Sequence, residues 1–266
     1  MIAILSASEH DFYAMPLPFV VYSWIKAGVW PVIFIPKGNN PKLRLARRYC
    51  VGDIIEFDCQ ENKVSTYSQV IRLFGAAGND SLRNCKETLI TGDSDMCVFG
   101  RTTIIGDLLH SVNDGNIHVV GNDLTPEDQY PICFVAMTAS DWIECMDIGT
   151  KTANECAAEL IEPIQSTNLR GDAWSLDQWH LKKMLDLYKK PIVFHTRSNG
   201  ENQFAQNRAD RDGWHFNPDT LIDAHLPRPL TDPDNFQKVV DLFHIKYPQD
   251  DLSWMSEFYN EYIKLL

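Results

Sequence analysis

The 266-residue sequence predicts an α/β fold with a mixed, mainly parallel central sheet and helices on both faces. Short apolar runs alternate with amphipathic stretches along most of the chain, which is typical of this fold class. The first three elements follow the order strand, helix, strand, and such a βαβ unit favours parallel pairing. Because neither an internal repeat nor a linker divides the sequence, we expect residues 1–266 to form one domain.

Short apolar runs predict the strands. The first run, at residues 2–5, is followed by a polar loop at 6–13, and the second, WPVIFI at 30–35, stops before Pro36. The remaining predicted strands lie at 53–57, 87–90, 117–120, within the first part of 130–147, and at 191–195.

The predicted helices carry start and stop signals. A helix at 19–28 follows two prolines and ends at a glycine, and a helix at 65–77 begins with Ser and Thr and stops near Gly78. Residues 197–220 are polar and aperiodic, so we expect a long functional loop there. The other predicted helices lie in the second part of 130–147 and at 151–164, 172–188, 234–247 and 252–266.

Composition narrows the function classes. A formal net charge of −12 argues against a nucleic-acid partner, which would call for a basic surface. Seven scattered cysteines without a CxxC pair argue against a zinc ribbon or a disulfide framework. The sequence begins without a basic, signal-like segment and contains no apolar run of about 20 residues, so we expect a cytoplasmic protein without a transmembrane segment.

The acidic triplet Asp93-Ser94-Asp95 is the sharpest chemical signal. It follows the predicted strand at 87–90, and ligands of open α/β sheets bind at the carboxyl ends of strands. Where the chain turns, both carboxylates can approach one cation, and Mn²⁺ and Mg²⁺ prefer oxygen ligands. A diphosphate would supply further oxygens, and the metal would stabilise the charge of a departing nucleoside diphosphate. The triplet therefore predicts a Mn²⁺ or Mg²⁺ site that binds a diphosphate.

This layout resembles the GT-A glycosyltransferases, in which a DXD triplet ends a middle strand after a nucleotide-binding βαβ half. LITGDSDM is similar to the family's strand and DXD, and DAWSLDQWHL is similar to a helix start that carries a D-Q pair in several such families. The resemblance implies a metal-dependent glycosyltransferase that moves a hexosyl or pentosyl group from a UDP- or GDP-sugar to a saccharide or glycan acceptor. Residues 1–120 would form the nucleotide-sugar-binding half, and 121–266 the acceptor half with the C-terminal helices.

Several polar residues acquire expected roles from the resemblance. Ser6 ends the first strand, where such folds hold the nucleotide, and Gln69 and Arg72 share one helix face. Three arginines, Arg208, Arg211 and Arg228, have side chains suited to clamp a diphosphate or an acidic acceptor. The expected donor-binding residues are Ser6, Gln69, Arg72, Asp93, Ser94, Asp95 and Arg211.

Two carboxylates and one imidazole complete the expected site. An inverting enzyme needs a general base, and we expect Asp172 to serve as base and Asp177 to bind a sugar hydroxyl. Either carboxylate is equally suited to cap the following helix. A C-terminal histidine often completes the metal shell in GT-A enzymes, and we favour His225 over His195 as the ligand beside Asp93 and Asp95.

Other functions remain open at this stage. A sugar-phosphate nucleotidyltransferase shares the βαβ start and the metal carboxylates, but it usually has a Gly-rich, basic loop after the first strand. Here that loop reads SASEHDFY, without Gly, Lys or Arg. A phosphatase with an aspartyl nucleophile would carry its DxD after the first strand rather than at residue 93. A non-catalytic glycan-binding protein on the same fold is the third alternative.

Overall fold

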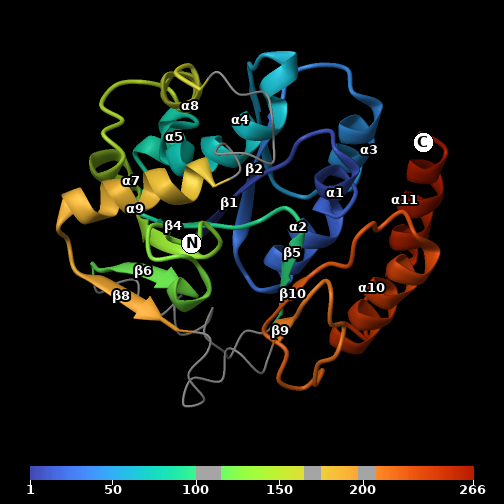
Figure 1. Cartoon of the computed structure of the whole chain (residues 1–266). Coiled ribbons are helices and arrows are strands. Elements are labelled where there is room, and N and C mark those ends of the chain that lie inside the picture. Colours follow the sequence, from blue (N-terminus) through green and yellow to red (C-terminus); the bar gives the residue numbers. More distant parts are fainter. Residues whose placement is uncertain (100–114, 165–174, 197–207) are drawn as a thin grey trace.

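The computed structural model describes residues 1–99, 115–164, 175–196 and 208–266 (Figure 1). A seven-stranded sheet with the order β3-β2-β1-β4-β7-β6-β8 forms its centre. The strands are β1 (Ile2–Ser6), β2 (Trp30–Pro36), β3 (Asp53–Phe57), β4 (Thr88–Thr91), β6 (Ile117–Val120), β7 (Val135–Thr138) and β8 (Ile192–His195).

Strand pairing confirms the mixed, mainly parallel sheet. β1 pairs in parallel with β2 and β4, β2 with β3, and β6 with β8. Only β7 runs antiparallel to its two neighbours in this sheet as described, β4 and β6. The carboxyl ends of β1, β2 and β4 therefore meet at one edge, where a ligand site is expected.

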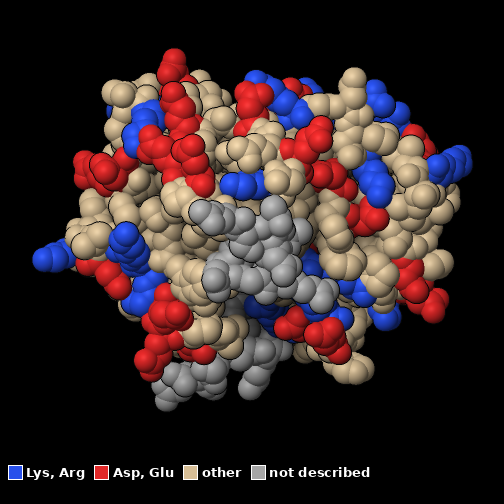
Figure 2. All heavy atoms as spheres, turned by 45° about the horizontal axis from the view of Figure 1, so that its top comes forward, with Lys and Arg blue, Asp and Glu red and all other residues tan. Residues whose placement is uncertain are grey.

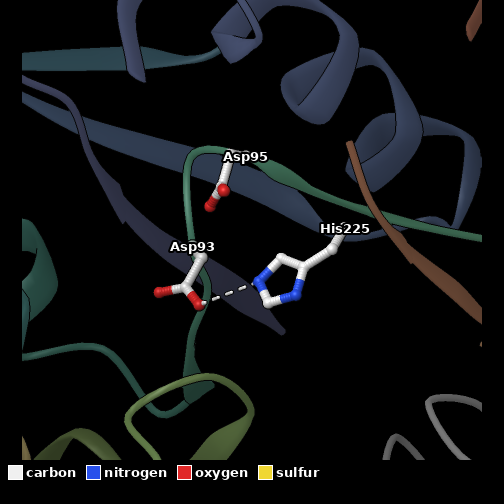
Figure 3. Close-up of side chains that lie close together, drawn as sticks. All are labelled: Asp93, Asp95 and His225. Carbon is white, nitrogen blue, oxygen red and sulfur yellow. Dashed lines mark ion pairs between the residues drawn. The ribbon is translucent and has the colours of Figure 1, made fainter. Parts of the chain in front are cut away.

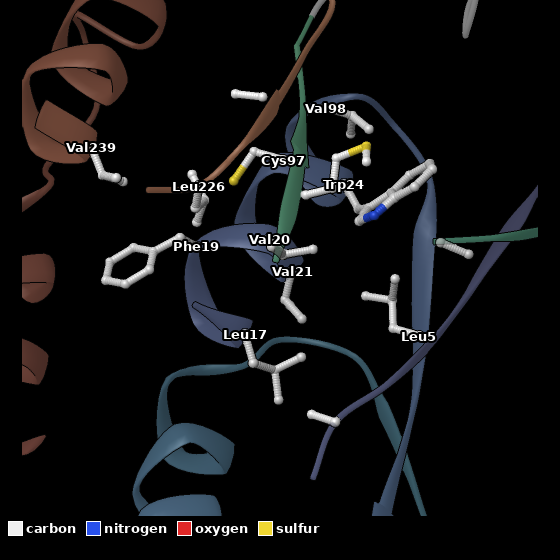
Figure 4. Packing of buried hydrophobic residues seen from close by; sticks show 14 of the residues in the cluster. Leu5, Leu17, Phe19, Val20, Val21, Trp24, Cys97, Val98, Leu226 and Val239 are labelled. Atoms are coloured by element: carbon white, nitrogen blue, oxygen red, sulfur yellow. The ribbon is translucent and has the colours of Figure 1, made fainter. Parts of the chain in front are cut away.

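Side chains of β1 alternate between two apolar cores, because successive residues of a strand face opposite sides of the sheet. Ala3 and Leu5 belong to one core, and Ile4 belongs to the other. Figure 4 shows the first core, in which Phe19 lies opposite Val239 of a C-terminal helix. The helices on this face are α1 (Asp11–Ala14), α2 (Leu17–Lys26), α3 (Pro41–Tyr49), α10 (Pro233–Lys246) and α11 (Ser253–Ile263).

The second core lies on the opposite face, so helices cover both faces as predicted. Its helices are α4 (Val64–Val70), η2 (Ile71–Ala77), α5 (Asp80–Arg83), α7 (Ala139–Cys145), α8 (Ala153–Ile161) and α9 (Leu176–Tyr188). Gly75 allows η2 to lie directly on β1, because a Cβ there would come within 2.6 Å of Ile4 Cγ2. Two short 3₁₀ turns, η1 (Glu61–Lys63) and η4 (Asn122–Leu124), lie in the connections.

A small second sheet joins distant parts of the sequence. Its strands are β5 (Met96–Val98), β10 (Asp223–His225) and β9 (Arg208–Ala209), in the order β5-β10-β9. β10 pairs antiparallel with β5 and parallel with β9. This pairing places the C-terminal part of the chain against the segment that follows the DXD triplet (Figure 1).

Some local predictions differ from the structure. The loop predicted at 6–13 contains the start of α1, and the single helix predicted at 65–77 is α4 followed by a 3₁₀ segment with non-helical dihedrals at Phe74. The predicted loop at 197–220 includes β9, and its residues 197–207 lie outside the described residues. The division into halves at residue 120 stays a prediction.

Charged side chains of both signs lie side by side over the described part of the face in Figure 2. The basic helix α3 is an example of local pairing: Lys42 contacts Asp11 at 2.7 Å, and Arg47 contacts Glu56 at 2.7 Å. No helix in the described ranges is both long and apolar enough to cross a membrane.

Candidate active site

A cavity of about 210 Å³ opens at the carboxyl ends of β1 and β4. It is bounded by α4, the start of α9 and the C-terminal segment around β10. The structure gathers in its walls all the predicted site residues that it describes: Ser6, Gln69, Arg72, Asp93, Ser94, Asp95, Asp177, Arg211 and His225. Asp172 lies outside the described residues.

Asp93, Asp95 and His225 form the centre of this site (Figure 3). One ligand atom from each lies within 4.8 Å of the other two. Gly92 lets the triplet approach the core closely, because a Cβ there would come within 2.8 Å of Leu5 Cδ2. Two carboxylates and one imidazole in this arrangement can hold a divalent metal ion, and the oxygen-rich set suits Mn²⁺ or Mg²⁺.

The small sheet explains how His225 reaches the triplet from 130 positions away. In the β10–β5 register His225 lies opposite Met96, and the Leu226 N–H donates to the Asp95 carbonyl at 2.9 Å. His195, the alternative ligand, lies elsewhere: its Nε2 is 3.0 Å from Nδ1 of His118, on which it stacks.

Both nitrogens of His225 face charged neighbours. Nε2 lies 4.0 Å from Asp93 Oδ2, and Nδ1 lies 3.7 Å from Asp210 Oδ1. Nδ1 also contacts the guanidinium of Arg208. The nearby His225 ring holds the pKa of the Asp210 carboxyl well below its usual range, against the effect of burial. Sequence reasoning did not identify Asp210, which has no signal beyond its position in a polar loop.

Arg72 lies buried beneath the triplet, only 7% exposed. Its Nη1 donates to the Gly92 carbonyl at 3.0 Å and contacts Asp93, while Nη2 donates to Asp177 Oδ2 at 3.0 Å. Burial opposes the charged form of Arg72, but the two carboxylates outweigh it and raise its pKa. For Asp93, burial would raise the pKa, but Arg72 and then His225 outweigh burial and lower it. Arg72 thus links the triplet to α9, a contact that its position beside Gln69 in the sequence does not reveal.

Asp177 is the second carboxylate on Arg72, and its environment differs from that of Asp93. Its Oδ1 accepts a hydrogen bond from the Gln178 N–H at 2.9 Å near the start of α9. Burial raises the pKa of Asp177 to about 6, because it outweighs the opposing charge of Arg72, and the nearby Asp93 adds to the rise. One buried guanidinium therefore serves two carboxylates, and the cluster keeps a negative charge when both are ionised.

Two arginines from the C-terminal segment form ion pairs with Asp95. Its Oδ2 lies 2.5 Å from Nη2 of Arg228 and 3.2 Å from Nη2 of Arg211. The Arg228 guanidinium carbon lies 5.0 Å from the ring centre of Phe12 and 5.1 Å from that of Tyr13. These aromatic rings help to hold the guanidinium in the cavity wall.

Hydroxyl groups line the cavity on the side of β1 and α4. Ser6 Oγ donates to the Ser68 carbonyl, and both residues are buried. Ser8 Oγ is also buried, and no described residue is its hydrogen-bond partner. Sequence reasoning missed Tyr13, Ser65 and Ser68 as cavity residues. Ser65 carried a signal, since it lies one helical turn before Gln69, on the same face.

A smaller cavity of about 170 Å³ adjoins the first and shares Asp93, Ile132, Gln178 and His225 with it. Its remaining walls come from the β6–β7 connection, Met96 and Arg208. The candidate metal site therefore lies between two cavities.

Comparison with known proteins identifies the fold. The sequence matches no protein-family model and none of the curated proteins. Galactosyltransferase LgtC, solved with donor and acceptor sugar analogs, is similar in structure: 12% sequence identity, 97% of this chain and 100% of that chain covered, TM-score 0.50. An LgtC active-site mutant has a TM-score of 0.49 at 12% identity, covering 96% and 99% of the two chains. A glycosyltransferase involved in glycosylation of the PBCV-1 major capsid has a TM-score of 0.44 at 11% identity, covering 91% and 99%.

The likeness to LgtC, at a TM-score of 0.50 over almost the whole of both chains, defines the class. This chain has the GT-A glycosyltransferase fold, as its sequence predicted. Its DXD-like triplet and a histidine lie together at the carboxyl edge of that sheet.

Proposed function

We propose that this chain is a metal-dependent glycosyltransferase that moves a hexosyl or pentosyl unit from a UDP- or GDP-sugar to a hydroxyl of a saccharide or glycan. One observation carries the proposal: ligand atoms of Asp93, Asp95 and His225 converge within 4.8 Å in a cavity whose walls also carry three arginines. This pair of features suits glycosyl transfer from a nucleotide sugar, because the leaving group of that reaction is a diphosphate.

In this proposal Asp93, Asp95 and His225 hold a Mn²⁺ or Mg²⁺ ion. When bound, the ion stabilises the negative charge of the departing nucleoside diphosphate. Arg72 keeps Asp93 in place, because it ties that carboxylate to Asp177 in the protein interior. The chain's own contribution is thus a preorganised set of charges at the position where charge develops.

The nucleoside is assigned to the hydroxyl-lined side of the cavity. Ser6, Ser8 and Gln69 lie there, close to the ends of β1 and α4. The buried Ser8 hydroxyl supports this assignment, because a buried polar group without a partner is costly unless a ligand or water satisfies it.

The transferred sugar is assigned to the region between the metal ligands and α9. Asp177 and Gln178 lie in that wall, and carboxylate and amide groups are suited to bind sugar hydroxyls. The adjoining cavity would take the acceptor, since it shares the metal-site wall. The assignment of Asp172 as general base stays a prediction.

Nucleotide binding tests the proposal. UDP or GDP at about a hundredfold excess over its Kd should stabilise the fold by about 2.7 kcal/mol. In a chain of this size that corresponds to a rise in Tm of about 5 to 10 °C. The rise should require Mn²⁺ and disappear in chelator, and the nucleotide that gives it should direct the choice of nucleotide sugars for a transfer assay.

Matched variants connect that result to the site. Asp95→Asn and His225→Gln should lose the Mn²⁺-dependent rise in Tm. Asp241→Asn and His244→Gln should keep it, because both residues are exposed on α10 outside the cavity. An equal rise in chelator, or no rise with any nucleotide in Mn²⁺, would contradict the proposal.

A further inference from the structure

Asp95 differs from the other two candidate metal ligands because two guanidinium groups already contact it. Arg228 and Arg211 both reach the same oxygen, Oδ2, at 2.5 and 3.2 Å. Asp95 is only 3% exposed, so water offers it little alternative solvation. In this arrangement the negative charge that should attract a metal ion is already compensated.

In the described part of the chain, no second carboxylate holds either arginine. Among the described residues, Asp95 is the only carboxylate within ion-pairing distance of Arg228 or of Arg211. Both side chains line the cavity assigned to the donor, and Arg228 is held over it by Phe12 and Tyr13. A guanidinium fork matches a phosphate group as well as it matches a carboxylate.

We infer that Arg228, together with Arg211, is a diphosphate-binding residue that rests on Asp95 when the donor is absent. This inference rests on the proposed function. A divalent ion on Asp95 would lie close to two guanidinium groups and be repelled by them. A nucleoside diphosphate offers those groups another anion, so that Asp95 becomes free for the metal ion. Metal and diphosphate therefore bind cooperatively, and each binds weakly alone.

Thermodynamic linkage sharpens the consequence. The factor by which the diphosphate improves metal affinity must equal the factor by which the metal improves diphosphate affinity. Loss of Arg228 should act in opposite directions on the two ligands. Arg228→Gln should bind Mn²⁺ alone more tightly, because a competitor for Asp95 is gone, and should bind the nucleotide with Mn²⁺ more weakly.

The experiment measures free Mn²⁺ by electron paramagnetic resonance in titrations of the full chain without nucleotide. We expect Arg228→Gln to lower the Mn²⁺ Kd at least about fivefold, the lower end of ordinary coupling between sites. Arg211→Gln should lower it by less, because its contact is longer. The control is Arg44→Gln, which removes an exposed arginine of α3 outside the cavity and should leave the Kd unchanged. Arg211→Gln, which removes the second guanidinium from Asp95, keeps the test decisive if Arg228→Gln does not fold.

A second set of titrations adds UDP or GDP, with uridine or guanosine as probes that lack the diphosphate, and corrects for Mn²⁺ bound to free nucleotide. Wild type should gain Mn²⁺ affinity at least about fivefold with the diphosphates and not with the nucleosides. One outcome would refute the inference alone: wild type binds nucleotide with Mn²⁺, but Arg228→Gln binds Mn²⁺ alone no more tightly than wild type. In that case Arg228 does not exchange Asp95 for the diphosphate, and the proposed function stands. If wild type binds neither UDP nor GDP in Mn²⁺, the proposed function fails and the coupling fails with it.

Discussion

The buried cluster of Arg72, Asp93 and Asp177 makes a prediction about stability and pH that has a definite sign. Two carboxylates share one guanidinium, and burial raises the pKa of Asp177 to about 6 from an ordinary value of 3.8. The perturbation is Asp177→Asn, which keeps the size of the side chain and an acceptor oxygen for Arg72 but cannot ionise.

The magnitude follows from the two pKa values. Between about pH 4 and pH 6 the folded protein keeps a proton on Asp177 that the unfolded chain releases, so the unfolded state is favoured as pH rises. The difference between the two values corresponds to about 3 kcal/mol. The contribution of Asp177 to stability is thus fully present below pH 4, is lost as pH rises through about 6, and is constant above pH 7.

The assay is urea unfolding at a series of pH values from 3 to 8 in chelator, followed by tryptophan fluorescence. We expect the free energy of unfolding of wild type, relative to Asp177→Asn, to fall by about 3 kcal/mol between pH 3 and pH 7. The control is Asp241→Asn, an exposed carboxylate on α10, for which the corresponding difference should show no such fall.

The opposite sign would refute this reasoning. If the contact with Arg72 governed Asp177 more strongly than burial, the pKa of the carboxyl would lie below 3.8. Wild type would then gain stability relative to Asp177→Asn as pH rises through the acid range. A constant difference at all pH values would show that Asp177 titrates alike in the folded and unfolded chains.

Two further substitutions test the packing that positions the site. Arg72→Met should lower the free energy of unfolding in urea at pH 7 by about 3 to 5 kcal/mol, because it leaves Asp93 and Asp177 without their shared cation. The control Arg44→Met should lower it little, and equal losses for the two variants would contradict the buried ion-pair cluster. Gly92→Ala should cost about 1 to 3 kcal/mol, because its Cβ would come within 3.0 Å of the buried Trp24 ring, and Gly213→Ala, with open space around it, should be neutral. A neutral Gly92→Ala would show that the backbone before the triplet is free to shift.

Hydrophobic periodicity and the proline and glycine residues that end the apolar runs predict the large sheet well. Its strands are short, mostly apolar runs, and β1, β2 and β3 pair in the simple βαβ order that the sequence suggests. The missed helix α3 also had a signal: the Asn40 side chain accepts from the N–H groups of Lys42 and Leu43, and Pro41 occupies the first turn. The small sheet had no comparable signal, because β9 and β10 contain two and three residues.

Some residues of the candidate site could likewise be predicted from the sequence, and others could not. Asp93 and Asp95 are readable from the sequence, because they follow an apolar strand directly. The contacts of Arg72 are not, since they join a residue of η2 to carboxylates 21 and 105 positions away. Helical spacing relates Arg72 to its neighbours within one turn, but only the packing of η2 against the sheet turns its side chain inward.

Local charge, rather than the net charge of the chain, decides what the cavity can bind. The chain carries −12 overall, which alone would repel a diphosphate. The described residues of the cavity walls, however, include three aspartates (Asp93, Asp95 and Asp177) and three arginines (Arg72, Arg211 and Arg228), whose charges sum to zero when all are ionised. Such a lining neither repels nor attracts a dianion strongly, and one divalent ion would balance it. Without a ligand, the ion pairs of Asp95 with the arginines keep the cavity neutral. If Asp95 instead bound the metal ion and the arginines bound the diphosphate, the cavity would stay neutral with both ligands present.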